Sequence, residues 1–155
     1  MHDITDTESV IREAERLLDE GGPQVARSIL APYVAQRVPA ALFLYSSVSA
    51  PGEGIEAFER RSFEMLSEAA ELGHVPAITA LAKCFDTGDR VEQDCQRAAI
   101  LFEQAAACGH PQAKLYHGLN LFYGSNGIRA DRKEAIRLLQ EAEAEGVQDE
   151  RTSLS

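Results

Sequence analysis

The stretch AITALAKCFDTGDRVEQDCQRAAILFEQAAACG, from Ala77 to Gly109, decides the fold. Its apolar residues recur at intervals of three and four, first up to Phe85 and again up to Ala106, which predicts two amphipathic helices. Gly88 lies between the two helical segments, and Gly109 follows the second one. Glycine tolerates the backbone of a turn or of a helix end, so the stretch is predicted to be a helix–turn–helix unit.

The same pattern occurs before and after this stretch. The helix-stop glycines Gly73, Gly109 and Gly146 are 36 and 37 residues apart. The turn also recurs, as residues 52–55, 88–91 and 124–128, and the last copy is one residue longer. Asp94 and Asp131 each precede a predicted second helix, where an aspartate can cap the free backbone N–H groups. Self-similarity at this period is typical of helical repeat proteins.

The repeated residues resemble the Sel-one-like repeat family, a relative of the tetratricopeptide repeats. The central copy keeps the family's residues at Ala77, Leu81, Gly88, Val91, Asp94, Ala98, Ala105, Ala106 and Gly109. It departs from the family pattern at Ala82, Phe85, Arg90 and the pair Leu101–Phe102. The resemblance implies an all-α fold, a right-handed α/α solenoid of about four helix–turn–helix repeats, hence eight helices.

We expect one repeat domain over residues 8–147, with units at about 8–36, 38–73, 74–109 and 110–146. An acidic, flexible lead (1–7) and a flexible tail (148–155) would flank it. The helix expected in residues 23–34 contains Pro32, which should kink or shorten it. The later helices are expected at 38–50, 55–72, 75–85, 94–108, 111–123 and 131–145.

Small residues are expected to let the helices approach closely. Ala98, Ala105 and Ala106 lie on one face of a predicted helix, and the larger Leu101 and Phe102 fill the space beside them. Gly73, Gly109 and Gly146 are expected to take the left-handed conformation that ends a helix. These eight residues are therefore predicted to have structural roles.

Charge and composition narrow the function classes. The 155 residues carry a net charge of −10, which disfavours nucleic acids and anionic membrane surfaces as partners. No apolar run approaches the ~20 residues of a membrane span. The first residues show no secretory signal, so we expect a cytoplasmic protein, or a periplasmic one if a signal peptide has been removed. Three cysteines do not make a paired disulfide framework.

The reactive side chains lack the spacing of a catalytic or metal site. His74 and His110 follow equivalent glycines, so the repeat explains the pair, and His117 is expected to be half-buried between helices. Cys95 lies at a predicted helix start, where the thiol pKa can fall, so mild thiol reactivity is an open alternative. The other cysteines, Cys84 and Cys108, add no Cys-x2-Cys pair. We expect no cofactor, no metal and no catalytic residue.

A partner groove is the remaining prediction. In tetratricopeptide-like stacks the first helix of each unit lines a concave groove. Aligning the repeats of this sequence with that pattern predicts eight groove residues. They are Thr79, Lys83, Asp86, Leu115, Leu119, Asn120, Phe122 and Tyr123. Leu115, Leu119 and Phe122 share one helical face, rimmed by Lys83 and Asn120. The alternative is that Leu115 and Phe122 pack against the last helix.

The resemblance therefore favours a non-catalytic protein–protein interaction module, an adaptor or scaffold, in a bacterial cell. The partner would be another protein with a basic or amphipathic segment, because the chain is acidic. One alternative is an immunity-type inhibitor that neutralises a bacterial effector. A further alternative is a hydrolase or redox enzyme that uses Cys95 or a histidine. The sequence leaves the oligomeric state open.

Overall fold

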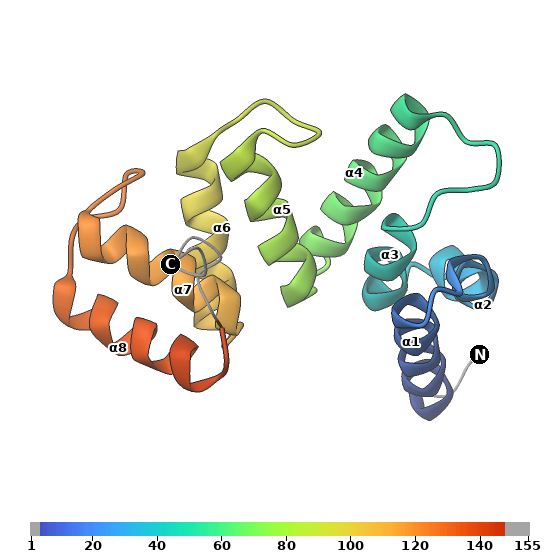
Figure 1. Ribbon diagram of the computed structural model, residues 1–155, viewed down its shortest axis with the longest axis horizontal. Coiled ribbons are helices and arrows are strands. Elements are labelled where there is room, and N and C mark those ends of the chain that lie inside the picture. The colour runs from blue at the N-terminus through green and yellow to red at the C-terminus, as the bar shows by residue number, and fades with distance from the viewer. Residues whose placement is uncertain (1–3, 148–155) are drawn as a thin grey trace. The chain divides into compact units, whose positions relative to one another are not determined.

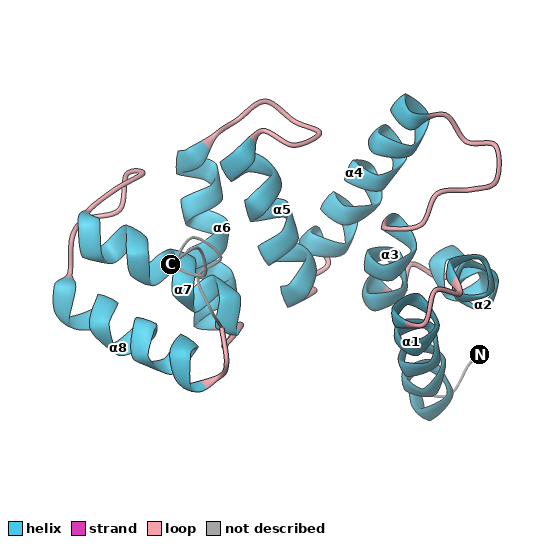
Figure 2. Cartoon of the chain, in the orientation of Figure 1, coloured by secondary structure: helices cyan, strands magenta, loops and turns pink. Residues whose placement is uncertain are grey.

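The computed structural model describes residues 4–147, and within that range it contains eight helices and no strand (Figures 1 and 2). The helices are α1 (Ile4–Asp19), α2 (Pro23–Ala35), α3 (Pro39–Ser46), α4 (Ile55–Glu71), α5 (Val75–Thr87), α6 (Cys95–Ala107), α7 (Pro111–Tyr123) and α8 (Arg132–Ala144). The all-α prediction is confirmed. The predicted tail, 148–155, lies outside the described residues.

The chain divides into two units, which meet between Ala77 and Ile78. The first unit holds α1 to α4 and the first residues of α5, and the second holds the rest of α5 with α6, α7 and α8. Each unit is described by itself below. The single continuous domain over residues 8–147 stays a prediction.

In the first unit, α2 packs against α1 and α3, and α3 packs against α4. Its core gathers Ala14, Ala26, Leu30, Tyr33 and Ala41. Because α1 begins at Ile4, residues 4–7 of the expected flexible lead are helical. Asp6 in this first turn accepts a 2.9 Å hydrogen bond from the Tyr33 hydroxyl. No sequence pattern predicted this contact, which joins residues 27 positions apart.

Two features of the first unit differ from expectation. Helix α2 continues through Pro32 to Ala35, so the proline does not shorten it. Pro32 lies in the last turn, where its missing N–H removes a single helical hydrogen bond. Helix α3 ends at Ser46 rather than near residue 50. Helix α4 then starts at Ile55 after Gly54, which supplies no side-chain cap.

A side chain from within α4 holds the α3–α4 loop. The guanidinium of Arg61 donates to both carboxylate oxygens of Glu53, at 2.9 and 2.8 Å, and to the Val48 carbonyl at 2.8 Å. Glu53 also accepts a 3.1 Å bond from the Ala50 backbone N–H. Together these bonds lower the pKa of Glu53 to about 2. The Glu53 side chain is only 14% exposed, so the loop is tied to the body of the helix.

In the second unit, α6 packs against α7, and α7 packs against α8. Its two hairpin loops close in the same way. The Asp94 N–H donates to the Phe85 carbonyl at 2.8 Å, and its carboxylate accepts from the Arg97 N–H at 3.0 Å. Asp131 repeats both contacts, with the Leu121 carbonyl at 2.9 Å and the Glu134 N–H at 3.2 Å. The two aspartates are therefore helix caps, as their spacing predicts.

The helix ends also repeat. Gly73, Gly109 and Gly146 have φ angles of +88°, +89° and +85°. The residue after each glycine donates its N–H back to the carbonyl five positions earlier, to Ala69, Ala105 and Ala142, at 3.0–3.1 Å. This pattern satisfies carbonyls that a helix end leaves free. Arg37 takes the same place after α2 with a φ of +59°.

Small residues set the packing of the second unit. Ala98, Ala105 and Ala106 are buried, Phe102 is 2% exposed, and Leu101 is half-buried. Gly118 of α7 faces α8 so closely that an added Cβ would lie 3.0 Å from two atoms of the Leu139 side chain. Among residues 4–147, no helix combines the length and apolar character that a membrane span needs.

Candidate functional site

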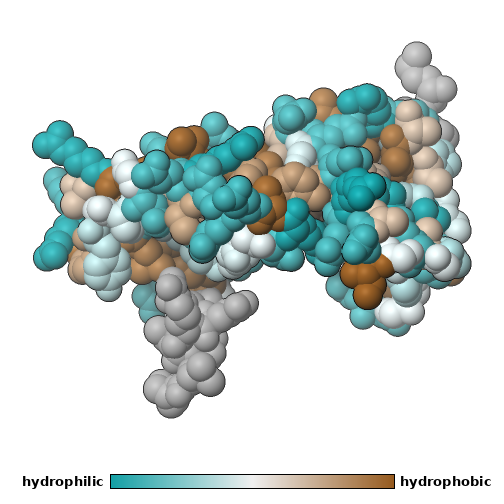
Figure 3. Space-filling model, turned by 90° about the horizontal axis from the view of Figure 1, so that it is seen from above, coloured by the Kyte–Doolittle hydropathy of each residue, from teal (hydrophilic) through white to brown (hydrophobic). Residues whose placement is uncertain are grey.

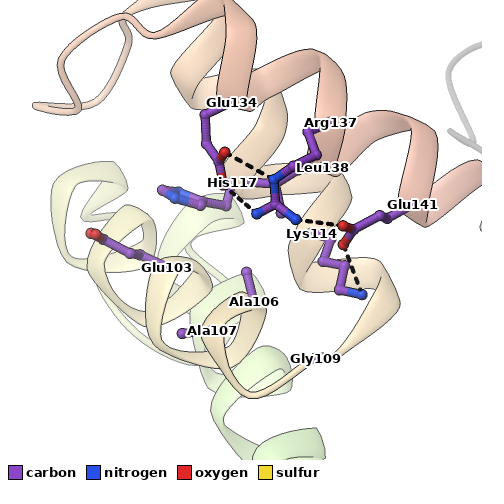
Figure 4. Close-up of a pocket in the computed structure, with 10 residues that line it drawn as sticks. All are labelled: Glu103, Ala106, Ala107, Gly109, Lys114, His117, Glu134, Arg137, Leu138 and Glu141. Atoms are coloured by element: carbon purple, nitrogen blue, oxygen red, sulfur yellow. Dashed lines mark hydrogen bonds and ion pairs between the residues drawn. The ribbon is translucent and has the colours of Figure 1, made fainter.

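The second unit contains a pocket of about 470 Å³ between α6 and α8, with α7 as its floor (Figure 4). Its lining residues are Glu103, Ala106, Ala107, Gly109, Lys114, His117, Glu134, Arg137, Leu138 and Glu141. The α6 residues Ala106 and Ala107 are small, and Gly109 has no side chain, so this wall leaves room for a ligand. Most of the remaining lining side chains are charged.

The cations of the pocket are already paired. Arg137 donates to the carboxylates of Glu134 and Glu141 on its own helix. Lys114 of α7 lies 3.2 Å from Glu141 and 2.8 Å from Glu145, so it links α7 to α8. These bonds lower the pKa of Glu134 and raise the pKa of Lys114. The charged forms of Glu134 and Lys114 are therefore favoured.

His117 differs from these paired side chains because one of its ring nitrogens lacks a hydrogen-bond partner among the described residues. This nitrogen, Nδ1, is buried. Burial lowers the pKa of His117, although the nearby carboxylates of Glu103 and Glu134 act in the opposite direction. The ring is consequently neutral at pH 7, and a neutral imidazole presents one nitrogen as an acceptor.

The predicted groove residues are only partly available to a partner. Thr79 is 2% exposed and Asn120 is 8% exposed, so both are covered. Asn120 was expected at the rim of a partner site. Instead, its side-chain oxygen accepts from Ser125 Oγ at 3.1 Å and from Asn126 Nδ2 at 2.9 Å. Its role is to hold the α7–α8 turn, because a buried amide needs such partners.

Phe122 belongs in part to the core. It packs against the buried cluster of Leu121, Ala135 and Leu138, and the Arg132 guanidinium lies 5.0 Å from its ring centroid. For Phe122 the structure therefore matches the alternative prediction, packing against the last helix. Tyr123 meets the Phe122 ring edge-on at 5.0 Å and is 72% exposed.

The other groove residues lie along α5 and α7. The Lys83 ammonium is 5.9 Å from the centroid of the Tyr116 ring, so these two helices are neighbours within the second unit. Leu115 and Leu119 are half-buried. The Asp86 carbonyl accepts from Gln93 Nε2 at 2.7 Å. Of the predicted groove residues, Tyr123 is exposed, whereas Lys83 and Leu119 are half-buried.

The histidines and cysteines have structural surroundings. His110 Nδ1 accepts from the Ala113 N–H at 3.4 Å at the start of α7, and the His74 ring lies 5.2 Å from that of Phe43. Burial raises the pKa of Cys84, and the half-buried Cys95 thiol donates to the Asp86 carbonyl at 3.7 Å. Within residues 4–147, no three His, Cys, Asp or Glu side chains are grouped as metal ligands.

The sequence prediction missed the pocket. Lys114 and His117 are three residues apart, and Glu134, Arg137 and Glu141 are three and four apart. Such spacing puts each set on one helical face, which was the available signal. What spacing could not show is that the two faces meet across α7 and α8.

Models of the Sel1 repeat match three consecutive segments of the chain, residues 39–74, 75–110 and 111–147. A Sel1 repeat protein from Oxalobacter formigenes has a similar structure, with a TM-score of 0.68 and 26% identity over 81% of this chain and 93% of that one. The structure of c5321, a protective antigen of uropathogenic Escherichia coli with an SLR fold, is also similar, with a TM-score of 0.66 and 25% identity. The match covers 78% of this chain and 26% of that one.

Two further likenesses are more limited. Helicobacter pylori cysteine rich protein B, at 17% identity and a TM-score of 0.56, covers 94% of this chain and 97% of its own, and supports the fold alone. Chitin synthase regulator SKT5 of Saccharomyces cerevisiae is 36% identical over 83 residues, which are 51% of this chain but 12% of the yeast protein. This chain therefore spans a small part of that regulator.

The matched repeats occupy more than half of the chain, and the solved relatives share its helical architecture. The predicted α/α solenoid class is confirmed by these likenesses. Proteins with these repeats generally act as non-catalytic scaffolds for other proteins. The chain belongs to the Sel1 repeat family.

Proposed function

We propose that this chain is a non-catalytic adaptor or scaffold that binds a partner protein on the surface of α5 and α7. The observation that carries the proposal is Tyr123, a large aromatic side chain that is 72% exposed. Tyrosine is enriched among residues that dominate binding energy, because its ring buries much area while its hydroxyl finds a partner.

Neighbouring side chains support a binding surface there. Leu119 is half-buried and lies one turn before Tyr123 on the same side of α7. Lys83, over the Tyr116 ring, brings a cation to the edge of this surface. A mixed surface of aromatic, aliphatic and charged groups is typical of protein interfaces. The face of the molecule in Figure 3 is largely hydrophilic, with small separate hydrophobic areas.

The non-catalytic part of the proposal rests on what the reactive side chains do. His110 caps α7, and the Cys84 thiol is buried, with its pKa raised. A buried thiol with a raised pKa is a poor nucleophile, because the thiolate is the reactive form. Cys95 is engaged with a backbone carbonyl. His110, Cys84 and Cys95 therefore have structural roles that account for them without catalysis.

Affinity capture from the native cell tests the proposal. The wild-type chain and Tyr123→Ala would be used as baits, and each captured protein quantified by mass spectrometry. We expect at least one partner whose recovery falls by about fivefold or more with Tyr123→Ala, consistent with a loss of roughly 1–3 kcal/mol. Ile55→Ala is the control, since Ile55 is 78% exposed on α4.

Two outcomes separate the alternatives. Equal recovery of every partner by wild type and Tyr123→Ala would overturn the α5–α7 surface. A captured partner that is a toxic effector, and that loses its activity when bound, would assign the chain to the inhibitor role rather than the scaffold role.

A further inference from the structure

The pocket between α6 and α8 is separate from the proposed α5–α7 surface. Lys114 and His117 project into it from α7, whereas Leu119 and Tyr123 lie on another side of the same helix. The pocket therefore needs its own explanation. Its volume of about 470 Å³ is large enough for one long side chain together with water.

The charges of the pocket exclude an anion as its best guest. Three lining carboxylates, Glu103, Glu134 and Glu141, face two lining cations. Both cations, Lys114 and Arg137, are held by glutamates, so an anion would have to displace an existing ion pair. The surplus charge is negative, which favours a cationic guest.

One acceptor remains for such a guest. The Glu103 carboxylate on α6 has neither an ion pair nor a hydrogen bond within residues 4–147, and Figure 4 shows it beside the His117 ring. The Nδ1 atom of His117 is fully buried, so it is out of reach of a ligand in the pocket.

We propose that this pocket binds the guanidinium group of an arginine side chain presented by a partner protein. The planar guanidinium carries five N–H donors, so it can donate to both carboxylate oxygens of Glu103, and the Glu134 and Glu141 carboxylates add to the attraction. An ammonium group has fewer donors and no planar match, so lysine binds more weakly. The chain's net charge of −10 favours such a basic partner.

The proposal rests on the proposed function only for the source of the arginine. The pocket itself is tested without a partner, so its failure and that of the α5–α7 surface are distinguishable. The probe is Nα-acetyl-arginine N-methylamide, titrated into the full chain while the imidazole nuclei of His117 are followed by NMR. The signal is assigned by its loss in His117→Gln.

We expect a saturable shift of the His117 signal with an affinity in the millimolar range, as befits a single side chain. The uncharged analogue Nα-acetyl-citrulline N-methylamide should bind at least fivefold more weakly. Glu103→Gln should weaken arginine binding at least fivefold. Its control is Glu143→Gln, which makes the same charge change at an exposed site on α8 and should bind as the wild type does.

A pH series adds a readout that a structural role would not move. As pH falls below about 6.5, His117 gains a proton, and its positive charge opposes a cationic ligand, so arginine binding should weaken. The other charged groups that line the pocket are Glu103 from α6, Lys114 from α7, and Glu134, Arg137 and Glu141 from α8. Absence of a saturable shift, or equal affinity in Glu103→Gln and Glu143→Gln, would overturn the proposal.

Discussion

The α3–α4 hairpin of the first unit and the two hairpins of the second unit close their loops by different means. In the second unit, Asp94 and Asp131 cap the helix that follows each loop and also bond back to the preceding helix. In the first unit, Gly54 stands before α4 and makes no side-chain cap. There Arg61, in the second turn of α4, reaches back to Glu53 and the Val48 carbonyl.

The difference shows that a repeat can keep its helix–turn–helix fold when a side chain from within the second helix, rather than a cap at its start, holds the loop. Without an aspartate cap, α4 begins immediately after Gly54 and runs for 17 residues, whereas α6 and α8 have 13 residues each. Arg61, within α4, makes the contacts that hold this loop. We therefore expect the stability of the α3–α4 hairpin to depend mainly on Arg61. In the second unit, each cap and turn should contribute a smaller part of the stability.

Removing Arg61 should have the largest effect. Arg61→Ala removes the donor of the Val48 carbonyl and leaves the Glu53 carboxylate with the Ala50 N–H, and a largely buried group that loses its partner is costly. We expect the melting temperature to fall by roughly 5–10 °C. Arg60→Ala, at the exposed neighbouring position, is the control. Equal thermal melts of the two variants, followed by circular dichroism, would remove the basis of the comparison.

Exchanging the residue at a helix end should have a smaller effect. Gly109→Val forces a β-branched residue to a φ of +89°, which should cost about 1–2 kcal/mol, although the space around its Cβ is open. Arg37→Gly at the matching place after α2 relieves a φ of +59° but removes the ion pair with Glu68. Its stability should change by no more than about 0.5 kcal/mol. Chemical denaturation measures both, and a Gly109→Val variant as stable as wild type would contradict the helix-stop role.

Removing one cap should cost about 1 kcal/mol, since each aspartate satisfies one backbone N–H. Asp94→Ala and Asp131→Ala should therefore be similar to each other and milder than Arg61→Ala. Asp94→Asn and Asp131→Asn should recover most of the loss, because asparagine caps as well as aspartate does. If the asparagine variants were as unstable as the alanine variants, the carboxylates would act through their charge rather than as caps.

The pH dependence of stability should separate the contribution of the histidines from that of Glu53. Burial lowers the pKa of His74, His110 and His117, so the unfolded chain binds protons more readily, and stability should fall as pH drops below about 6.5. Glu53, with a pKa of about 2, stays ionised through that range, and its contribution is lost only as pH falls from about 4.5 toward 2. His117→Gln should reduce the first loss in denaturation curves. A wild-type stability constant from pH 7 to 5 would contradict this assignment.

Local features of the fold were predictable from the sequence. The caps at Asp94 and Asp131 and the stops at Gly73, Gly109 and Gly146 depend on residues within one turn, so spacing alone identifies them. The start of α4 at Ile55 was also predicted correctly, whereas α3 was expected to run to residue 50 and ends at Ser46. The contact of Arg61 with Glu53 joins residues eight positions apart across a helix start, which helical spacing does not identify.

Sites formed between elements could not be predicted in the same way. Register placed Thr79 and Asn120 on a groove surface, but their burial depends on side chains from other segments. The pocket at His117 depends on how closely α7 approaches α8, which the absence of a side chain at Gly118 permits. Helical periodicity predicts which residues share a face, and it does not predict which faces meet.

Hydrogen exchange of the complex with its captured partner tests the central claim most directly. Amide exchange would be compared, by mass spectrometry, between the free chain and the complex. The proposed α5–α7 surface predicts slower exchange in Pro111–Tyr123, with α1 and α2 unchanged. Slower exchange confined to α1–α4, with α7 exchanging as in the free chain, would contradict it.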